Sequence, residues 1–122
     1  MKLSQIFEYA SSNPFVGVVS SLDLRIKQVE VATHSSDHSS VFTTSLHRQL
    51  NDLLKFLDSS SKWVIPASKL KTEFHSALPE IKRNVVAAQR SIGSNVKAAL
   101  GHLMVARDIA VKRSHLKFGG IE

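Results

Sequence analysis

Apolar residues recur every three or four positions along most of the chain, which is the spacing of one face of an α-helix. In the first part, this pattern predicts a short helix over residues 3–10 that stops before Pro14, and a second helix that begins near Phe15. Residues 22–31 also alternate well enough to form a strand. A single strand would lack a partner, so the helix is favoured there.

A polar, serine-rich loop is expected over residues 33–40, since its composition offers nothing to bury. A helix with a wide apolar stripe is expected to follow from Phe42 to Leu57. Thr43 or Thr44 could cap this helix by accepting a hydrogen bond from a free backbone amide.

The connection at residues 59–66 interrupts the helical pattern. Its Trp63, Val64 and Ile65 are expected to pack back onto the core. The alternative is an exposed aromatic platform on which a base or a partner could stack. Ser68 is the expected N-cap of the next helix.

Pro79 is expected to end that helix or to kink it. A new helix that begins near Pro79 and Glu80 is favoured, because a proline in the first turn loses no hydrogen bond. We expect the new helix to run unbroken to Lys117, since the glycine at Gly93 costs only about 1 kcal/mol within a helix. The alternative is that Gly93 closes one helix in a left-handed conformation while Ser94 or Asn95 caps the next.

The predicted C-terminal helix carries one line of apolar residues, which we call the seam. The seam consists of Ile81, Val85, Ala88, Ile92, Val96, Ala99, Leu103, Ala106 and Ala110. A second apolar set widens it and consists of Val86, Leu100, Met104, Val105, Ile109 and Val111. Together they exceed what one neighbouring helix covers, so we expect a homodimer. The residues expected at the dimer contact or in its packing are Val85, Ile92, Val96, Leu100, Leu103, Met104 and Ile109.

Charge is distributed unevenly between the two halves of the chain. The net charge is +6 at pH 7, but residues 1–61 hold five Lys or Arg against six Asp or Glu, whereas residues 62–122 hold eleven against four. Clustered positive charge is typical of proteins that bind phosphate, in a nucleic acid or at an anionic membrane. The alternative is that these charges only keep the helix in solution.

The cations of the predicted C-terminal helix lie opposite the seam. Arg83, Arg90 and Lys97 repeat every seven residues, so on one helix they would span about 20 Å and could follow a phosphate backbone. Asp108 is the only acid between Ile81 and Lys117, whereas a solvating face would mix both signs. The expected nucleic-acid-binding residues are Lys69, Lys71, Lys82, Arg83, Arg90, Lys97, Arg107 and Lys112.

No catalytic or metal-binding signature stands out in the sequence. The chain has no cysteine, its closest histidines (His34 and His38) lie in a polar loop, and no serine sits in a nucleophile elbow. We therefore expect no enzyme, no cofactor, no metal and no small-molecule substrate. Without a signal peptide or a membrane-spanning run, a cytoplasmic or nuclear protein is expected.

These patterns predict an all-α protein with a single domain over residues 1–122. The expected fold is a small bundle of four to five helices with a long C-terminal amphipathic helix and a flexible tail over residues 118–122. The expected function is sequence-independent binding of nucleic acid, with double-stranded RNA favoured, since no base-reading module is evident.

The nearest analogy, one of architecture only, is with small helical dimers that grip double-stranded RNA. Several of these are viral, so a viral accessory protein is one candidate. One alternative is an oligomerisation or adaptor module that binds a protein through the seam. Another is a basic helix from Asn95 to Phe118 that lies on an anionic membrane.

Overall fold

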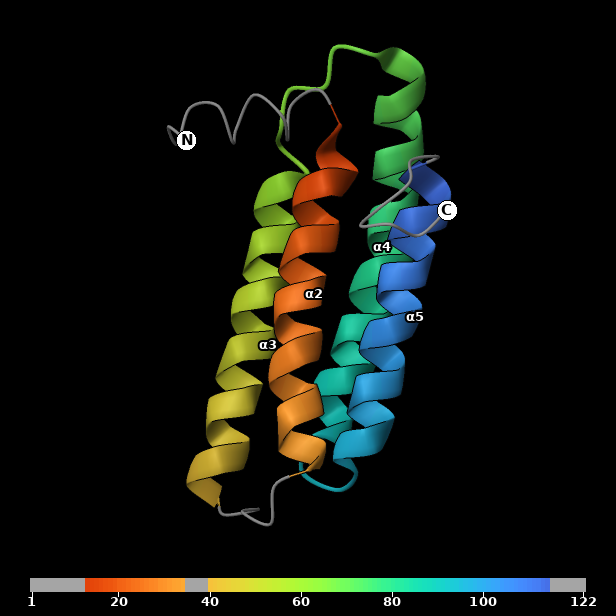
Figure 1. The fold of residues 1–122 in the computed structure, drawn as a ribbon. Helices are drawn as coiled ribbons and strands as arrows, with labels where there is room; N and C mark the ends of the chain where they lie inside the picture. Colours follow the sequence, from red (N-terminus) through yellow and green to blue (C-terminus); the bar gives the residue numbers. More distant parts are fainter. Residues whose placement is uncertain (1–12, 35–39, 115–122) are drawn as a thin grey trace, which may run out of the picture.

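The computed structural model describes residues 13–34 and 40–114, and this part of the chain forms four α-helices and no strand. The helices are α2 (Pro14–Thr33), α3 (Ser40–Ser60), α4 (Ser68–Ser91) and α5 (Val96–Ser114). They run alternately up and down, and each packs on its neighbours in the order α2, α3, α4, α5 and back to α2 (Figure 1). The expected all-α helical bundle is confirmed. The helix expected over residues 3–10 and the tail expected over 118–122 lie outside the described residues.

The helix α2 confirms that residues 22–31 are helical and not a strand. Asn13 caps this helix, since its side-chain oxygen accepts a hydrogen bond from the backbone amide of Phe15 at 3.1 Å. Pro14 occupies the first turn, where its missing amide loses no hydrogen bond. The largest fully buried side chains of the bundle are Phe15, Phe74, Leu22, Leu50, Leu53, Leu57, Ile81, Ile92 and Leu103.

Aromatic rings pack at the end of the bundle where α3 passes into α4. Trp63 stacks on Phe74 with ring centroids 6.2 Å apart, and it meets Phe56 edge-on at 5.6 Å. Ile65 is buried as well, but Val64 is 79% exposed, contrary to the expectation that all three apolar residues of this connection pack inward. Trp63 is thus part of the packing and not an exposed aromatic platform.

The expected starts of two helices are wrong. The helix α3 already begins at Ser40, so Thr43 and Thr44 lie inside it and not at its cap. The helix α4 begins at Ser68 itself, and the cap position is Ala67, which makes no side-chain hydrogen bond. The spacing of apolar residues predicts which residues of a helix are buried. It does not predict the residue at which the helix begins to better than one or two positions.

The helix α4 continues through Pro79, contrary to the expectation that Pro79 separates two helices. Pro79 is exposed, while Leu78 and Ile81 beside it are buried. A proline inside a helix removes one backbone hydrogen bond and costs about 3 kcal/mol. Full burial of an apolar side chain contributes about 1.5–3 kcal/mol, so the packing of its neighbours offsets the local cost.

The expected unbroken helix to Lys117 is also wrong, because the chain turns between α4 and α5. The amide of Asn95 donates to the carbonyl of Ser91 at 2.7 Å, and the Asn95 side chain caps α5 by accepting a hydrogen bond from the amide of Ala98 at 3.0 Å. Gly93 lies in this turn without a left-handed backbone. Because of this turn, the seam residues of α4 and those of α5 lie on neighbouring helices and pack into the same core. On a single straight helix the two halves of the seam would lie end to end.

Candidate nucleic-acid interface

The turn between α4 and α5 divides the predicted basic stripe between two antiparallel helices. Arg83 and Arg90 remain together on α4, about 10 Å apart along its axis. Lys97 belongs to the first turn of α5 and lines a hollow of about 410 Å³ with Thr33 and Asn95. The expectation of one row of three cations is therefore wrong. Two cations form the row on α4, and Lys97 stands apart from them.

Two of the predicted binding residues form ion pairs that join neighbouring helices. Lys82 Nζ on α4 pairs with Asp58 Oδ1 on α3, and Arg107 Nε on α5 pairs with Asp23 Oδ1 on α2. The side chains of Lys82 and Arg107 are half-buried against their partners. Both residues therefore hold the bundle together, and part of their charge is neutralised within the chain.

Two cations near the end of α5 form ion pairs with the acidic residues of α4 and α5. Arg113 Nε lies 2.7 Å from Glu73 Oε2, and its Nη1 lies 3.3 Å from Glu80 Oε2. Lys112 Nζ lies 3.0 Å from Asp108 Oδ2, four residues earlier on the same helix. No other acid occurs in α4 or α5. All the carboxylates of these two helices are therefore engaged by cations of the chain itself.

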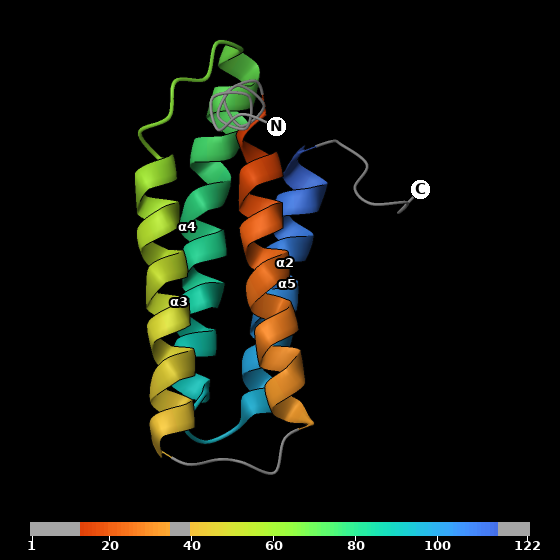
Figure 2. The same ribbon diagram turned by 60° about the vertical axis from the view of Figure 1, so that its left-hand side comes forward.

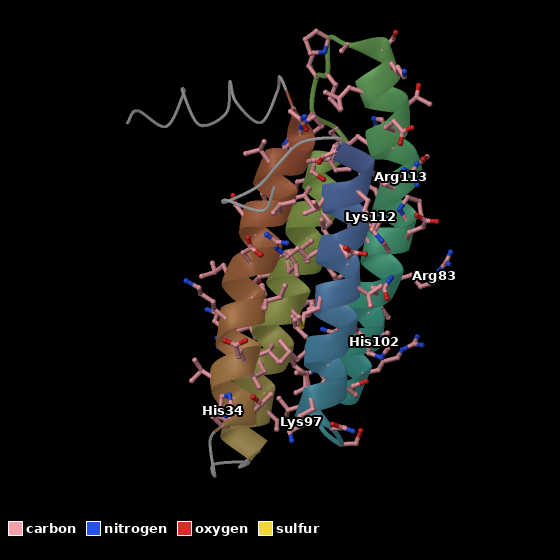
Figure 3. All side chains as sticks on the ribbon, turned by 45° about the vertical axis from the view of Figure 1, so that its right-hand side comes forward. His34, Arg83, Lys97, His102, Lys112 and Arg113 are labelled. Atoms are coloured by element: carbon pink, nitrogen blue, oxygen red, sulfur yellow. The ribbon has the colours of Figure 1, made fainter. Side chains whose placement is uncertain are left out.

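Arg113 is a residue that the sequence analysis missed. Its guanidinium lies between α5 and α4 (Figure 3), and besides the two carboxylates it donates a hydrogen bond to the hydroxyl of Ser76. Glu73 and Glu80 are seven residues apart and share one face of α4, which is the available sequence signal. The signal becomes readable only once α5 is known to run antiparallel beside that face.

The remaining predicted cations are exposed and have no acid partner among residues 13–34 and 40–114. They are Lys69, Lys71, Arg83, Arg90 and Lys97. Figure 3 shows that Arg83 points away from the bundle into solvent. We call Arg83 and Arg90 the α4 row. The packed helix fixes the points from which both side chains extend, so the row presents positive charge to solvent on one side of α4.

The seam lies inside the bundle. Val85, Ile92 and Leu103 are buried in the core, and Val96, Leu100 and Ile109 are half-buried and pack against it. Met104 differs, since 55% of its surface is exposed, and Val105 beside it is 48% exposed. The seam thus joins α4 and α5 to the rest of one chain. Of the apolar residues expected at a dimer contact, Met104 is the one that the bundle leaves largely uncovered.

The same burial bears on the expected membrane-binding helix from Asn95 to Phe118. The apolar side of α5 is occupied by the core, where Ala99, Leu103 and Ala106 are fully buried. No helix among the described residues is long and apolar enough to cross a membrane. Phe118 lies outside the described residues.

A shallow apolar groove of about 260 Å³ lies between α2 and α3. Its lining residues are Gln28, Val31, Phe42, Ser45, Leu46 and Gln49. The side-chain oxygen Oε1 of Gln49 is buried there without a hydrogen-bond partner. On the outer side of α2, Leu24 is 53% exposed and Val31 is 69% exposed. Exposed apolar side chains thus occur on α2 as well as at Met104 and Val105 of α5.

Groups that could bind a metal do not gather in the described part of the chain, where no three His, Asp or Glu residues lie together in a suitable arrangement. Comparisons with protein-family models, with curated proteins and with solved structures find no match to this chain. The functional interpretation therefore depends on the charges and contacts described above.

Proposed function

We propose that this protein binds nucleic acid without catalysis and without reading base sequence, through a basic surface centred on the α4 row, and that its preferred ligand is double-stranded RNA. The observation that carries this proposal is that every carboxylate of α4 and α5 forms an ion pair with a cation of α5. Arg113 and Lys112 engage all of them, so Arg83 and Arg90 keep their charge for an external anion.

The chemistry of the row suits phosphate. An arginine guanidinium presents fixed pairs of N–H donors that match two phosphate oxygens, and it stays charged at any physiological pH. Contacts of this kind release condensed counterions and carry no base information, so binding should be salt-dependent and independent of sequence.

Two further points support a duplex ligand. Single-stranded nucleic acids are commonly held by bases stacked on exposed aromatic side chains. The one tryptophan of the chain, Trp63, is packed between Phe56 and Phe74. A face of rigid helices instead suits a preformed double helix, which is recognised by its shape and its phosphates.

A homodimer is part of the proposal. The exposed Met104 and Val105 on α5 would supply its apolar contact, in place of the buried seam. A second copy would double the number of basic faces and so the number of phosphate contacts.

The test is a fluorescence anisotropy titration of a 20-bp RNA duplex at two salt concentrations. We expect Arg83→Ala/Arg90→Ala to weaken binding of every sequence and to lower the salt slope by about two units, because each lost phosphate contact lowers it by about one. The control is Lys27→Glu on the exposed side of α2, which changes the net charge by the same amount. Unchanged affinity of the double alanine variant, with its helicity intact, would contradict the proposal.

A second candidate is an adaptor that binds a protein partner. The observation that favours it is the apolar groove between α2 and α3, with the unpaired oxygen of Gln49 in its lining and the exposed Leu24 beside it on α2. An adaptor of this kind would not bind the RNA duplex at any salt concentration, so the same titration separates the two functions.

A further inference from the structure

The helix α3 carries two exposed cations that are not apparent from the net charge of residues 1–61. Arg48 and Lys55 are seven residues apart and both are exposed. Neither has an acid partner among the described residues. We call them the α3 row. Because residues 1–61 have slightly more acids than bases, the net charge gives no sign of this row.

The α3 row lies on the outer face of α3, opposite the buried residues Leu46, Leu50, Leu53 and Leu57. Asp58 pairs with Lys82, and the carbonyl of His47 accepts a hydrogen bond from Gln89 Nε2 at 3.2 Å. At about 100° per residue, Lys55 lies about 60° and Arg48 about 80° around the helix from Asp58, on the side away from the core. Both therefore project outward from α3, and α4 borders α3 on the side that carries Asp58.

The same contacts fix the level of each cation along the bundle. The helices α3 and α4 are neighbours that run in opposite directions (Figure 2). With Asp58 opposite Lys82 and His47 opposite Gln89, Lys55 lies within about one turn of the level of Arg83, and Arg48 within about one turn of Arg90. The α3 and α4 rows therefore form the four corners of a quadrilateral.

The size of this quadrilateral follows from helix geometry. Two residues seven apart are separated by about 10 Å along a helix, and packed helix axes are about 8–10 Å apart. Because each row lies opposite the buried side of its own helix, both rows project outward and their charged tips lie further apart than the two axes. The result is two parallel lines of positive charge, each two cations long.

We propose that the α3 and α4 rows together straddle a groove of a nucleic-acid duplex, with each row contacting the phosphates of one strand. A duplex offers two phosphate lines on either side of a groove, about 12 Å apart across the major groove of B-form DNA and across a wide, shallow minor groove in RNA. A single strand offers only one such line. The inference rests on the proposed nucleic-acid binding and specifies the duplex and the second set of contacts.

One acid lies within reach of this surface without a cation partner. Asp52 is exposed and follows Arg48 by four residues on α3, and no ion pair joins the two. Its carboxylate would repel a phosphate held by Arg48. Asp52→Asn removes this repulsion and keeps the size of the side chain, so it serves as a gain-of-affinity test.

The experiment compares four variants with the parent by fluorescence anisotropy and circular dichroism. They are Arg48→Ala/Lys55→Ala, Arg83→Ala/Arg90→Ala, Asp52→Asn and the control Lys27→Glu. The probes are a 20-bp RNA duplex, a 20-bp DNA duplex and each separate strand at two salt concentrations. We expect each double alanine variant to bind the duplexes at least about tenfold more weakly and to lose about two units of salt slope. The advantage of duplex over single strand should shrink in both, and Asp52→Asn should bind about two- to threefold more tightly.

The outcomes separate this inference from the function on which it rests. If the α4 variant loses affinity and the α3 variant does not, the straddling geometry is overturned while nucleic-acid binding stands. If neither variant loses affinity, or if Lys27→Glu loses as much as both, the two proposals fall together. Equal losses on duplex and on single strands would also overturn the straddling geometry, because a single strand cannot engage both rows.

Discussion

The helices α4 and α5 share one hydrophobic pattern, but their charged residues have different environments. The cations Arg83 and Arg90 of α4 have no acid partner among the described residues. On α5, Arg107, Lys112 and Arg113 are all paired. The difference arises because the paired cations of α5 face acids on α2, on α4 or within α5 itself. A charged helix face is therefore available to a ligand only where neighbouring helices do not neutralise it.

The two helices also differ in how their apolar residues are used. Apart from the half-buried Leu70, Val86 and Ala87, the apolar side chains of α4 point into the core. The helix α5 buries Leu103 in the same core but leaves Met104 and Val105 largely exposed. Both helices contribute to the core, so the large buried side chains of either should affect stability most. Among the cations, Arg107 and Arg113 of α5 should affect stability more than Arg83 and Arg90 of α4, because they link α5 to acids on neighbouring helices.

The largest effect is expected for Leu103→Glu on α5. Leu103 is fully buried, and an unpaired carboxylate in that position costs several kcal/mol, enough to unfold a domain of this size. The matched control is Met104→Glu, one residue further along and 55% exposed, which should change the free energy of unfolding by about 0.5 kcal/mol or less. Circular dichroism during thermal unfolding measures both. A strong loss of stability in Met104→Glu would mean that a second molecule covers Met104.

A smaller effect is expected for Arg113→Ala, which removes the link from α5 to Glu73 and Glu80. Hydrogen bonds to charged groups contribute about 1.5–3 kcal/mol when buried, but the side chain of Arg113 is 32% exposed, so a loss of about 1 kcal/mol is expected after solvent screening. Arg83→Ala on α4 should cost about 0.5 kcal/mol or less, because Arg83 is exposed and pairs with no acid in the described part of the chain. Urea unfolding of both variants measures the difference.

A double-mutant cycle refines this comparison. Combining Arg113→Ala with Glu80→Gln should give less than the sum of the two separate losses, because the two side chains interact. Combining Arg90→Ala with Glu80→Gln should be additive, because the two positions are ten residues apart on α4. Equal coupling in both cycles would contradict the view that the acids of α4 are engaged only from α5.

The sequence alone was sufficient for the parts of the fold that depend on burial. The spacing of apolar residues identified the helical class, the buried line from Ile81 to Ala110, and the outward position of Arg83 and Arg90. It left the turn at residues 92–95 as an alternative, because the seam continues in register across it. The packing of α4 against α5 distinguishes a helical hairpin from one long helix, and periodicity does not report that packing.

The sequence predicted those residues of the candidate site that lie together on one helix. Arg83 and Arg90 needed only the periodicity of α4. The pairing of Lys82 with Asp58 depends on which helices become neighbours. Half-chain charge totals also concealed Arg48 and Lys55, because acids elsewhere in residues 1–61 cancel them in the sum but not in space.

The only stabilising effect expected concerns Gly101 in the middle of α5, and it is smaller than the loss expected for Leu103→Glu. Gly101 is exposed, and a Cβ atom added to it meets nothing within 4 Å. A glycine inside a helix is about 0.5–1 kcal/mol less favourable than alanine, so Gly101→Ala should raise the free energy of unfolding by that amount and the melting temperature by about 3 °C. The exposed face of α5 that carries Gly101 and Met104 is also the surface proposed for the dimer. If a second copy packs closely there, the added methyl group should weaken the dimer, which light scattering at micromolar concentration would detect as a fall in mass. A stabilised variant of unchanged mass would instead mean that this face of α5 has no close partner, and it would leave the monomer with the α4 row as the binding unit.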